Sequence, residues 1–287
     1  MTGRLFVLLQ RILPRHWLTA IIYRIARIRT GFIKDALIRG FVRLYKVDVA
    51  EIEREIPADF PTFNDFFTRE LAPGARTVDT AKNSIISPVD GTVSAAKAIR
   101  NDNLFQAKGL EYSLDELLAL DLDRAHAFDD GIFTTIYLAP YNYHRVHMPL
   151  DAELVSAHYV PGDLFSVNET TVGLVDGLFH RNERLNLHFD TAVGPVALIF
   201  VGALNVGSIT TPWTGEIRPR KKGMVETRKL GRASRSLKKG DLLGWFNMGS
   251  TVILLLPANT ASWNDTLVAG ATVRMGEPVG SLLGNAK

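Results

Sequence analysis

The stretch Met248-Gly249-Ser250-Thr251-Val252-Ile253-Leu254-Leu255-Leu256 places a small turn directly before an apolar run. Short apolar or alternating runs bounded by turn residues indicate β-strands. Five similar runs lie upstream, and the sequence predicts a strand in each: Ile132 to Leu138, Ala152 to Tyr159, Leu185 to Phe189, Val196 to Val201 and Asn205 to Thr210. Residues 192–195 are the expected turn between two of these strands. The chain beyond its first third is therefore expected to be β-rich.

One helix is expected inside this β-rich part, where Ser113 and Glu116 have the spacing of a capping box. The sequence contains no repeated βαβ unit, no dinucleotide-binding glycine fingerprint and no P-loop, which disfavours a nucleotide-dependent enzyme. A junction is expected between residues 50 and 70, which contain Pro57 and Pro61.

Composition limits the chemistry that is open to the chain. Its 287 residues, 46% hydrophobic and 22% charged, suit one large or two ordinary folded domains. The absence of cysteine excludes a disulfide framework, a thiolate metal site and a cysteine nucleophile. Catalysis would have to use oxygen, nitrogen or an acquired group.

The net charge of +3 conceals two strongly basic zones. Residues 1–50 contain ten Lys or Arg and two acidic residues, and residues 218–239 contain ten Lys or Arg and only Glu226 as an acid. Such zones suggest a face that meets phosphates, of nucleic acid or of an anionic membrane. Glycine and serine within residues 218–239 indicate a long mobile loop, and its position shortly before Ser250 favours a role near the site.

The N-terminal zone favours the membrane over nucleic acid, because its cations are interleaved with apolar residues such as Leu5, Trp17, Tyr23 and Phe32. Basic amphipathic helices of this kind lie at the headgroup boundary. No uncharged apolar run approaches the ~18 residues that span a bilayer, and the run after Arg4 is too short for a secretory signal. The alternatives are a helical subdomain packed on the protein's own core and, less well supported, a mitochondrial-type targeting helix.

Three local patterns contain side chains suited to catalysis. Asp90 lies in a turn before a strand, His144 and His147 lie in Tyr141 to Pro149, and Ser250 follows Gly249. Two histidines three residues apart can share a helical turn and bind a metal, but none of His158, His180 and His188 stands out as a third ligand. We therefore expect acid-base use of the imidazoles and no metal site.

A serine after glycine suits a particular self-cleavage. The hydroxyl attacks the preceding carbonyl, the amide becomes an ester, and β-elimination leaves an N-terminal pyruvoyl group. The reaction needs a base and an acid that orients it, which Asp90, His147 and Ser250 could supply as a relay. No Gly-x-Ser-x-Gly motif surrounds Ser250, so an ordinary α/β-hydrolase is not expected.

Together, and in this order, the patterns resemble phosphatidylserine decarboxylases of the membrane-associated bacterial and mitochondrial type. The resemblance runs from about Phe63 to the C-terminus, and Met248 replaces the leucine that most members have before Gly-Ser-Thr. The matching segments are Phe63 to Leu71, Ser87 to Gly91, Tyr143 to Pro149, Val160 to Asn168 and Gly249 to Thr251.

The resemblance implies an α+β fold, with a β-rich barrel or sandwich core related to lipoyl- and biotinyl-carrier domains. Residues 1–60 would form an amphipathic helical membrane-association region, and residues 61–287 the catalytic domain. Cleavage between Gly249 and Ser250 would give a β chain, residues 1–249, and an α chain, residues 250–287. These two chains would form a heterodimer, and a homodimer of that unit is left open.

The resemblance also implies an activity. A covalent pyruvoyl group, a form of pyruvate derived from Ser250, would accept the electrons released when phosphatidylserine loses CO2 to become phosphatidylethanolamine. His144 would supply the returning proton or hold the carboxylate, with a structural role as the alternative. The enzyme would be peripheral on the cytoplasmic side of the cell membrane, with no nucleic-acid partner. Tyr159, Val160, Leu164 and Phe165 could line the lipid entrance or pack in the core.

Two other functions stay open on the sequence. A membrane-bound serine hydrolase would use Asp90, His147 and Ser250 without self-cleavage. A noncatalytic lipid-binding β module would make no use of these side chains.

Overall fold

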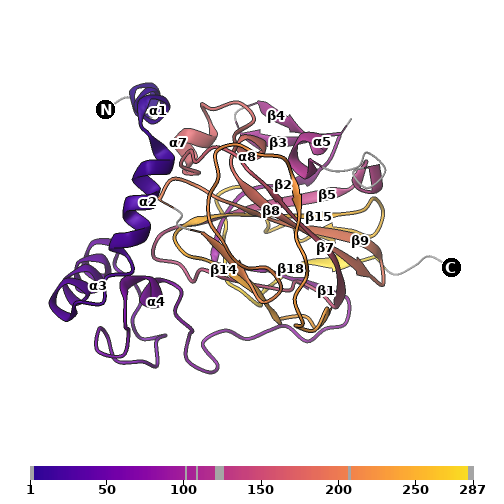
Figure 1. Ribbon diagram of the computed structural model, residues 1–287. Helices are drawn as coiled ribbons and strands as arrows, with labels where there is room; N and C mark the ends of the chain where they lie inside the picture. The colour runs from indigo at the N-terminus through magenta and orange to yellow at the C-terminus, as the bar shows by residue number, and fades with distance from the viewer. Residues whose placement is uncertain (1–2, 101, 108, 120–125, 206–207, 284–287) are drawn as a thin grey trace.

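The computed structural model describes residues 3–100, 102–107, 109–119, 126–205 and 208–283, with the helical N-terminus along one side of a β-rich body (Figure 1). The helices are α1 (Gly3–Ile12), α2 (Arg15–Ile25), α3 (Gly31–Tyr45), α4 (Phe63–Phe67), α5 (Leu114–Leu118), η1 (His126–Phe128), α7 (Glu169–Val172) and α8 (Leu178–Arg181). The strands are β1 (Ser84–Ile86), β2 (Gly91–Ala98), β3 (Asn103–Ala107), β4 (Leu110–Ser113), β5 (Ile132–Leu138), β6 (Arg145–His147), β7 (Ala152–Val160), β8 (Arg184–Thr191), β9 (Gly194–Val201), β10 (Ile209–Thr211), β11 (Gly215–Ile217), β12 (Glu226–Thr227), β13 (Ser236–Leu237), β14 (Leu242–Phe246), β15 (Ser250–Leu256), β16 (Ala261–Trp263), β17 (Thr272–Val273) and β18 (Pro278–Leu282).

The largest sheet has nine strands in the order β12-β7-β8-β9-β15-β5-β2-β17, and β13 also pairs with β7. Strand β15 lies inside this sheet, antiparallel to β5 on one side and to β9 on the other. All seven of its residues are buried. A strand that is covered on both faces has no need of polar alternation, which explains the continuous apolar sequence from Val252 to Leu256.

Three smaller sheets complete the body, in the orders β11-β10-β14-β6, β1-β18-β16 and β3-β4. Strand β6 pairs with β14, and this pairing places His147 opposite Leu242. Strand β14 comes shortly before Ser250 in the chain. The predicted α+β class with a β-rich core is confirmed. The barrel is wrong, because the sheets formed by the described residues are open: the large one ends in the short strands β12 and β17, which do not pair with each other. The relation to carrier domains stays a prediction.

Most predicted elements are present. Strand β5 has the predicted bounds, and β7, β8, β9 and β15 extend their predictions by one to three residues. The Ser113 hydroxyl accepts a hydrogen bond from the Glu116 amide, as a capping residue does. The strand predicted from Asn205 is confirmed only at its end, since Asn205 has a left-handed φ of 68° and β10 begins at Ile209; residues 206 and 207 lie outside the described residues. Within residues 218–239, only the two-residue strands β12 and β13 are regular.

The N-terminal helices pack on the body through one face. Ala26, Ile38 and Val47 form a buried cluster with the aromatic residues Phe60, Phe63, Phe66 and Phe67. Other faces of the same helices expose large apolar side chains, including Leu8, Ile12, Trp17, Phe32 and Leu44. Among the described residues, no single helix has the length and apolarity to cross a membrane; α1 and α2 pass that test only as a pair, bent by 86° at their junction.

The aromatic cluster should contribute strongly to stability. Phe66 is fully buried, with its ring edge-on to Phe60 at 5.4 Å and to Phe41 of α3 at 6.3 Å between centroids. We expect Phe66→Ala to lower the free energy of unfolding by about 3–5 kcal/mol, measured by urea denaturation. The matched control is Phe32→Ala, since Phe32 is 78% exposed and its loss should change stability by less than about 0.5 kcal/mol. Equal effects of the two substitutions would contradict this packing.

Candidate active site

Ser250 is the first residue of the central strand β15. Its backbone pairs with Leu138 of β5, and its side chain is completely buried. Within the described part of the chain, its hydroxyl has no hydrogen-bond partner. Burying an unsatisfied hydroxyl costs about 1–3 kcal/mol, so such a group is a candidate for chemistry.

His144 faces the peptide that precedes this serine. A Cβ added to Gly249 would lie 3.9 Å from His144 Nε2. The other ring nitrogen, Nδ1, donates a hydrogen bond to the carbonyl oxygen of Asn142 at 2.8 Å, and the ring packs on Phe67 with 4.1 Å between centroids. Because a neutral imidazole has one N–H, this bond leaves the lone pair of Nε2 free, close to Gly249.

The surroundings keep His144 uncharged. Burial, together with the positive charge of Arg69, lowers the pKa of His144 to about 3. Nε2 has no partner among the described residues. At neutral pH His144 is therefore a base or hydrogen-bond acceptor rather than a cation.

His147 has a different environment, although it is only three residues away. Its Nδ1 donates to the carbonyl oxygen of Gly240 at 2.7 Å, and its Nε2 accepts from the Tyr143 hydroxyl at 3.0 Å. Burial lowers the pKa of His147. The two histidines lie in a loop and in strand β6, so they do not share the helical turn that a metal site there would use.

Asp90 is bound by groups other than histidine in this structure. Its carboxylate forms an ion pair with Arg76 and accepts a hydrogen bond of 2.8 Å from the amide of Met275. The segment before Asp90 is joined to His147 through the backbone, where the His147 amide donates to the carbonyl of Pro88 at 2.8 Å. Asp90 and His147 are thus brought onto neighbouring segments without a direct hydrogen bond.

Two arginines at the site, Arg69 and Arg76, were not among the residues predicted from the sequence. Arg76 ties Asp90 to Glu51, which its guanidinium contacts at 2.9 Å. Arg69 is only 4% exposed, and its Nε and Nη1 have no acceptor within the described residues. Burial lowers the pKa of Arg69 to about 10, so it keeps its charge at neutral pH. Its presence in the segment Phe63 to Leu71, which the resemblance to the family had marked, was the available signal.

A cavity of about 180 Å³ opens at Ser250. Gly249 and Ser250 line it together with Phe41 and Tyr45 of α3, so an N-terminal helix forms part of its wall. Residues 166–168 and 203–205 complete one side. The residues suggested for a lipid entrance lie instead in the core: Tyr159, Val160, Leu164 and Phe165 are all buried.

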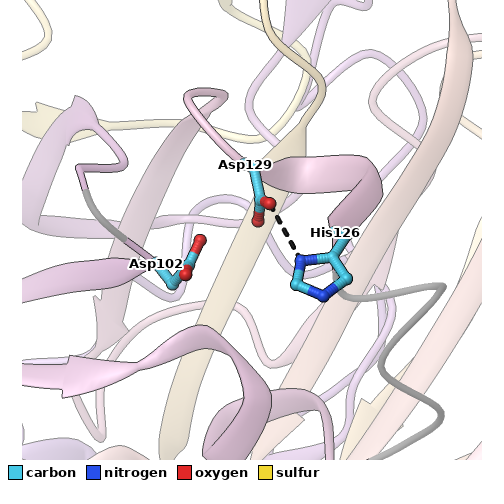
Figure 2. Close-up of side chains that lie close together, drawn as sticks. All are labelled: Asp102, His126 and Asp129. Carbon is cyan, nitrogen blue, oxygen red and sulfur yellow. Dashed lines mark hydrogen bonds and ion pairs between the residues drawn. The ribbon is translucent and has the colours of Figure 1, made fainter.

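A group with metal-ligand chemistry lies elsewhere. Figure 2 shows Asp102, His126 and Asp129, with His126 Nδ1 2.9 Å from a carboxylate oxygen of Asp129. None of the three lines the cavity at Ser250. Within the described ranges, His144 and His147 form no such group with another histidine or an acid.

Comparisons with known proteins agree over nearly the whole chain. A family model described as phosphatidylserine decarboxylase matches residues 63–281, and a second, described as PSD, matches residues 5–46. Curated relatives named phosphatidylserine decarboxylase proenzyme include one from Methylococcus capsulatus, 45% identical over 97% of this chain and 96% of the relative. Others come from Ectopseudomonas mendocina, 45% identical over the full length of both chains, and Acidovorax ebreus, 46% identical over 96% and 97%.

The charge state of His144 can be measured by nitrogen-15 NMR of the histidine rings. We expect His144 to remain neutral, with the proton on Nδ1, from about pH 8 to about pH 5, because both limits lie above its lowered pKa. His126 is the internal control: a hydrogen bond to Asp129 raises its pKa, so it should become protonated in this range as the pH falls. An imidazolium signal for His144 near pH 6 would contradict the assignment.

Proposed function

This chain belongs to the phosphatidylserine decarboxylase family, and we propose that it releases the carboxylate of phosphatidylserine as CO2, forming phosphatidylethanolamine. The observation that supports this most is the pairing of a buried, unpartnered Ser250 hydroxyl with a neutral imidazole whose lone pair faces the preceding peptide. A carboxy-lyase of this family becomes active only after it has cut its own chain, and both groups lie at the peptide to be cut.

The self-cleavage begins with Ser250. Its oxygen attacks the carbonyl carbon of Gly249, the Ser250 nitrogen leaves that carbon, and the amide becomes an ester. Removal of the Ser250 α-proton then expels the Gly249 carboxylate, and hydrolysis of the remaining enamine releases ammonia and leaves the pyruvoyl group on residue 250. The missing hydrogen-bond partner of the hydroxyl favours attack, because no protein contact has to be broken first.

We propose that His147 accepts the proton of this hydroxyl and that the Asp90 carboxylate orients His147. In the present arrangement the lone pair of His147 is occupied by Tyr143, and the Asp90 carboxylate by Arg76. The relay therefore requires that the Tyr143 hydroxyl release His147. The alternative base is His144, whose free Nε2 already faces Gly249.

The chain's residues fit the pyruvoyl group at position 250, since the Ser250 hydroxyl has no hydrogen-bond partner among the described residues that its conversion would remove. When formed, the group supplies a carbonyl that accepts the electrons released with CO2. His144, neutral with an open Nε2, would take up the proton that the substrate's ammonium group loses on reaction at residue 250 and would return it to the carbon that loses the carboxylate. Arg69 has two buried N–H groups without acceptors, and a carboxylate is the ligand that suits them.

The two products of cleavage would stay together. Residues 250–287 contain β15, β16, β17 and β18, and β15 is hydrogen-bonded on both sides by strands of the other chain. Separation would expose a fully buried strand to water. We therefore propose a permanent heterodimer of chains 1–249 and 250–287.

We further propose that residues 1–60 hold residues 61–287 on the cytoplasmic side of the cell membrane. The substrate's acyl chains resist leaving the bilayer by about 0.8 kcal/mol per CH2, so the enzyme has to reach the lipid at the surface. The exposed apolar side chains of α1 to α3 and the ten cations of residues 1–50 suit that surface, whose cytoplasmic leaflet is anionic.

Mass spectrometry of the denatured protein tests self-cleavage. Wild-type protein should give two masses divided after Gly249, the smaller with pyruvoyl in place of serine, whereas Ser250→Ala should give one intact mass. Thr251→Ala removes the neighbouring hydroxyl of the same strand and should still be cut. An intact, folded wild-type chain that reacts at Ser250 with a fluorophosphonate would support a serine hydrolase instead, and vesicle binding alone would support a lipid-binding module.

Substitution of the two histidines separates their roles. We expect His147→Ala and Asp90→Asn to leave the chain uncut, and His144→Ala to be cut but to lose CO2 release by a factor of about 100 or more. CO2 is measured from carboxyl-labelled phosphatidylserine, with the extent of cleavage read by mass in each sample. Normal cleavage in both His147→Ala and Asp90→Asn would refute the relay, and an uncut His144→Ala would make His144 the base.

A further inference from the structure

A second cavity, of about 390 Å³, lies between α2 and the start of the basic segment 218–239. One wall is made by His16, Thr19, Ala20 and Tyr23 of α2, and the other by residues 216–220 and Arg228. It shares no lining residue with the cavity at Ser250. Neither the self-cleavage nor the decarboxylation gives it a role.

The charges around this cavity are strongly unbalanced. Both nearby acids are already neutralised: Glu216 contacts Arg27 at 2.8 Å, and Glu226 forms ion pairs with Arg220 and Arg228. Arg218, which lines the cavity, forms no ion pair with any described residue, and neither do Lys221 and Lys222 beyond it. The excess positive charge calls for an anionic ligand.

The Arg218 guanidinium lies over the Tyr23 ring, 4.5 Å from its centroid, and further contacts that do not use Arg218, Lys221 or Lys222 hold the walls in place. His16 Nε2 donates to the carbonyl of Gly162 at 3.0 Å, and the Tyr23 hydroxyl donates to Glu216 at 3.2 Å. On the other wall, the amide of Arg220 donates to the Tyr159 hydroxyl at 2.9 Å, and that hydroxyl donates to the buried Glu183 at 2.6 Å. The cavity is therefore preformed, and a ligand need not order it.

The position of the cavity identifies the class of anion. Trp17, which follows His16 in α2, is 67% exposed, and Met224, which comes shortly after Lys221 and Lys222 in the sequence, is 86% exposed. Apolar side chains beside free cations suit a bilayer surface, where the former enter the headgroup region and the latter meet phosphates. An arginine fork also matches the geometry of phosphate oxygens.

We propose that this cavity binds the phosphate group of an anionic phospholipid. The inference rests on the proposed membrane association but not on the chemistry at Ser250. Thr19, in its wall, accepts a hydrogen bond from the amide of Asn205, which lines the Ser250 cavity. A bound lipid phosphate would thus fix the depth and orientation of α2 at the bilayer beside the active site.

The test compares two arginine substitutions that change the net charge equally. Full-length wild type, Arg218→Gln and Arg232→Gln are titrated with vesicles of phosphatidylcholine containing phosphatidylglycerol; Arg232 is exposed, lies in the same basic segment and does not line the cavity. We expect Arg218→Gln to raise the Kd for vesicles about tenfold and Arg232→Gln to raise it less than about twofold. Equal weakening would show unspecific attraction to the surface and would overturn the proposal.

A second arm identifies the source of the phosphate. Inorganic phosphate is titrated into wild type and Arg218→Gln without vesicles. The lipid proposal would be overturned if Arg218→Gln weakened the binding of inorganic phosphate while both proteins bound vesicles equally. That result would mean that the cavity binds a soluble phosphate ligand. Phosphatidylglycerol has no amine to react, so the same ratio is expected in a Ser250→Ala background. If wild-type protein showed no decarboxylase activity, the proposed function would be overturned, but the vesicle-binding result for Arg218→Gln would stand.

Discussion

The burial of strand β15 between β5 and β9 is the constraint on which the rest of the structure depends. Its position fixes the Gly249–Ser250 peptide at the edge of the core, where water does not compete for the serine hydroxyl. An unsatisfied hydroxyl in such a place reduces stability, and the surrounding apolar sheet is extensive enough to tolerate that cost. The hydroxyl is thereby ready for reaction at a position that the sheet determines.

His144 and His147 have the same side chain but different electrostatic environments. His144 lies against Phe67 with a buried arginine nearby, so it is neutral with a free lone pair, whereas His147 has both nitrogens engaged by Tyr143 and Gly240. Three residues along an extended segment change the face on which a side chain lies, which explains how one short motif supplies two environments. Separate roles in cleavage and in decarboxylation agree with this difference.

The central strands could be predicted from sequence, because short apolar runs between turn residues have few other uses in a β-rich chain. Local patterns indicated Asp90, His144, His147 and Ser250, and the family resemblance gave His144 its expected role. The partners of these residues were not predictable: Arg76 reaches Asp90 through a tertiary contact, and the hydrogen bond from Tyr143 to His147, although local, depends on a non-helical backbone that residue spacing does not specify. The predicted barrel was wrong for a similar reason. Closure of a sheet depends on whether its edge strands pair, whereas the hydrophobic pattern of a sequence indicates only that strands are present.

Helix α3 contributes Phe41 and Tyr45 to the cavity at Ser250, and Phe41 also packs against Phe67, on which His144 rests. The N-terminal helices, which we propose as the membrane anchor, therefore also form part of the active-site cavity. A different lipid-binding segment fused at residue 60 would leave that cavity without one wall, however well it bound the bilayer. Replacement of the proposed anchor would thus require matching changes around Ser250.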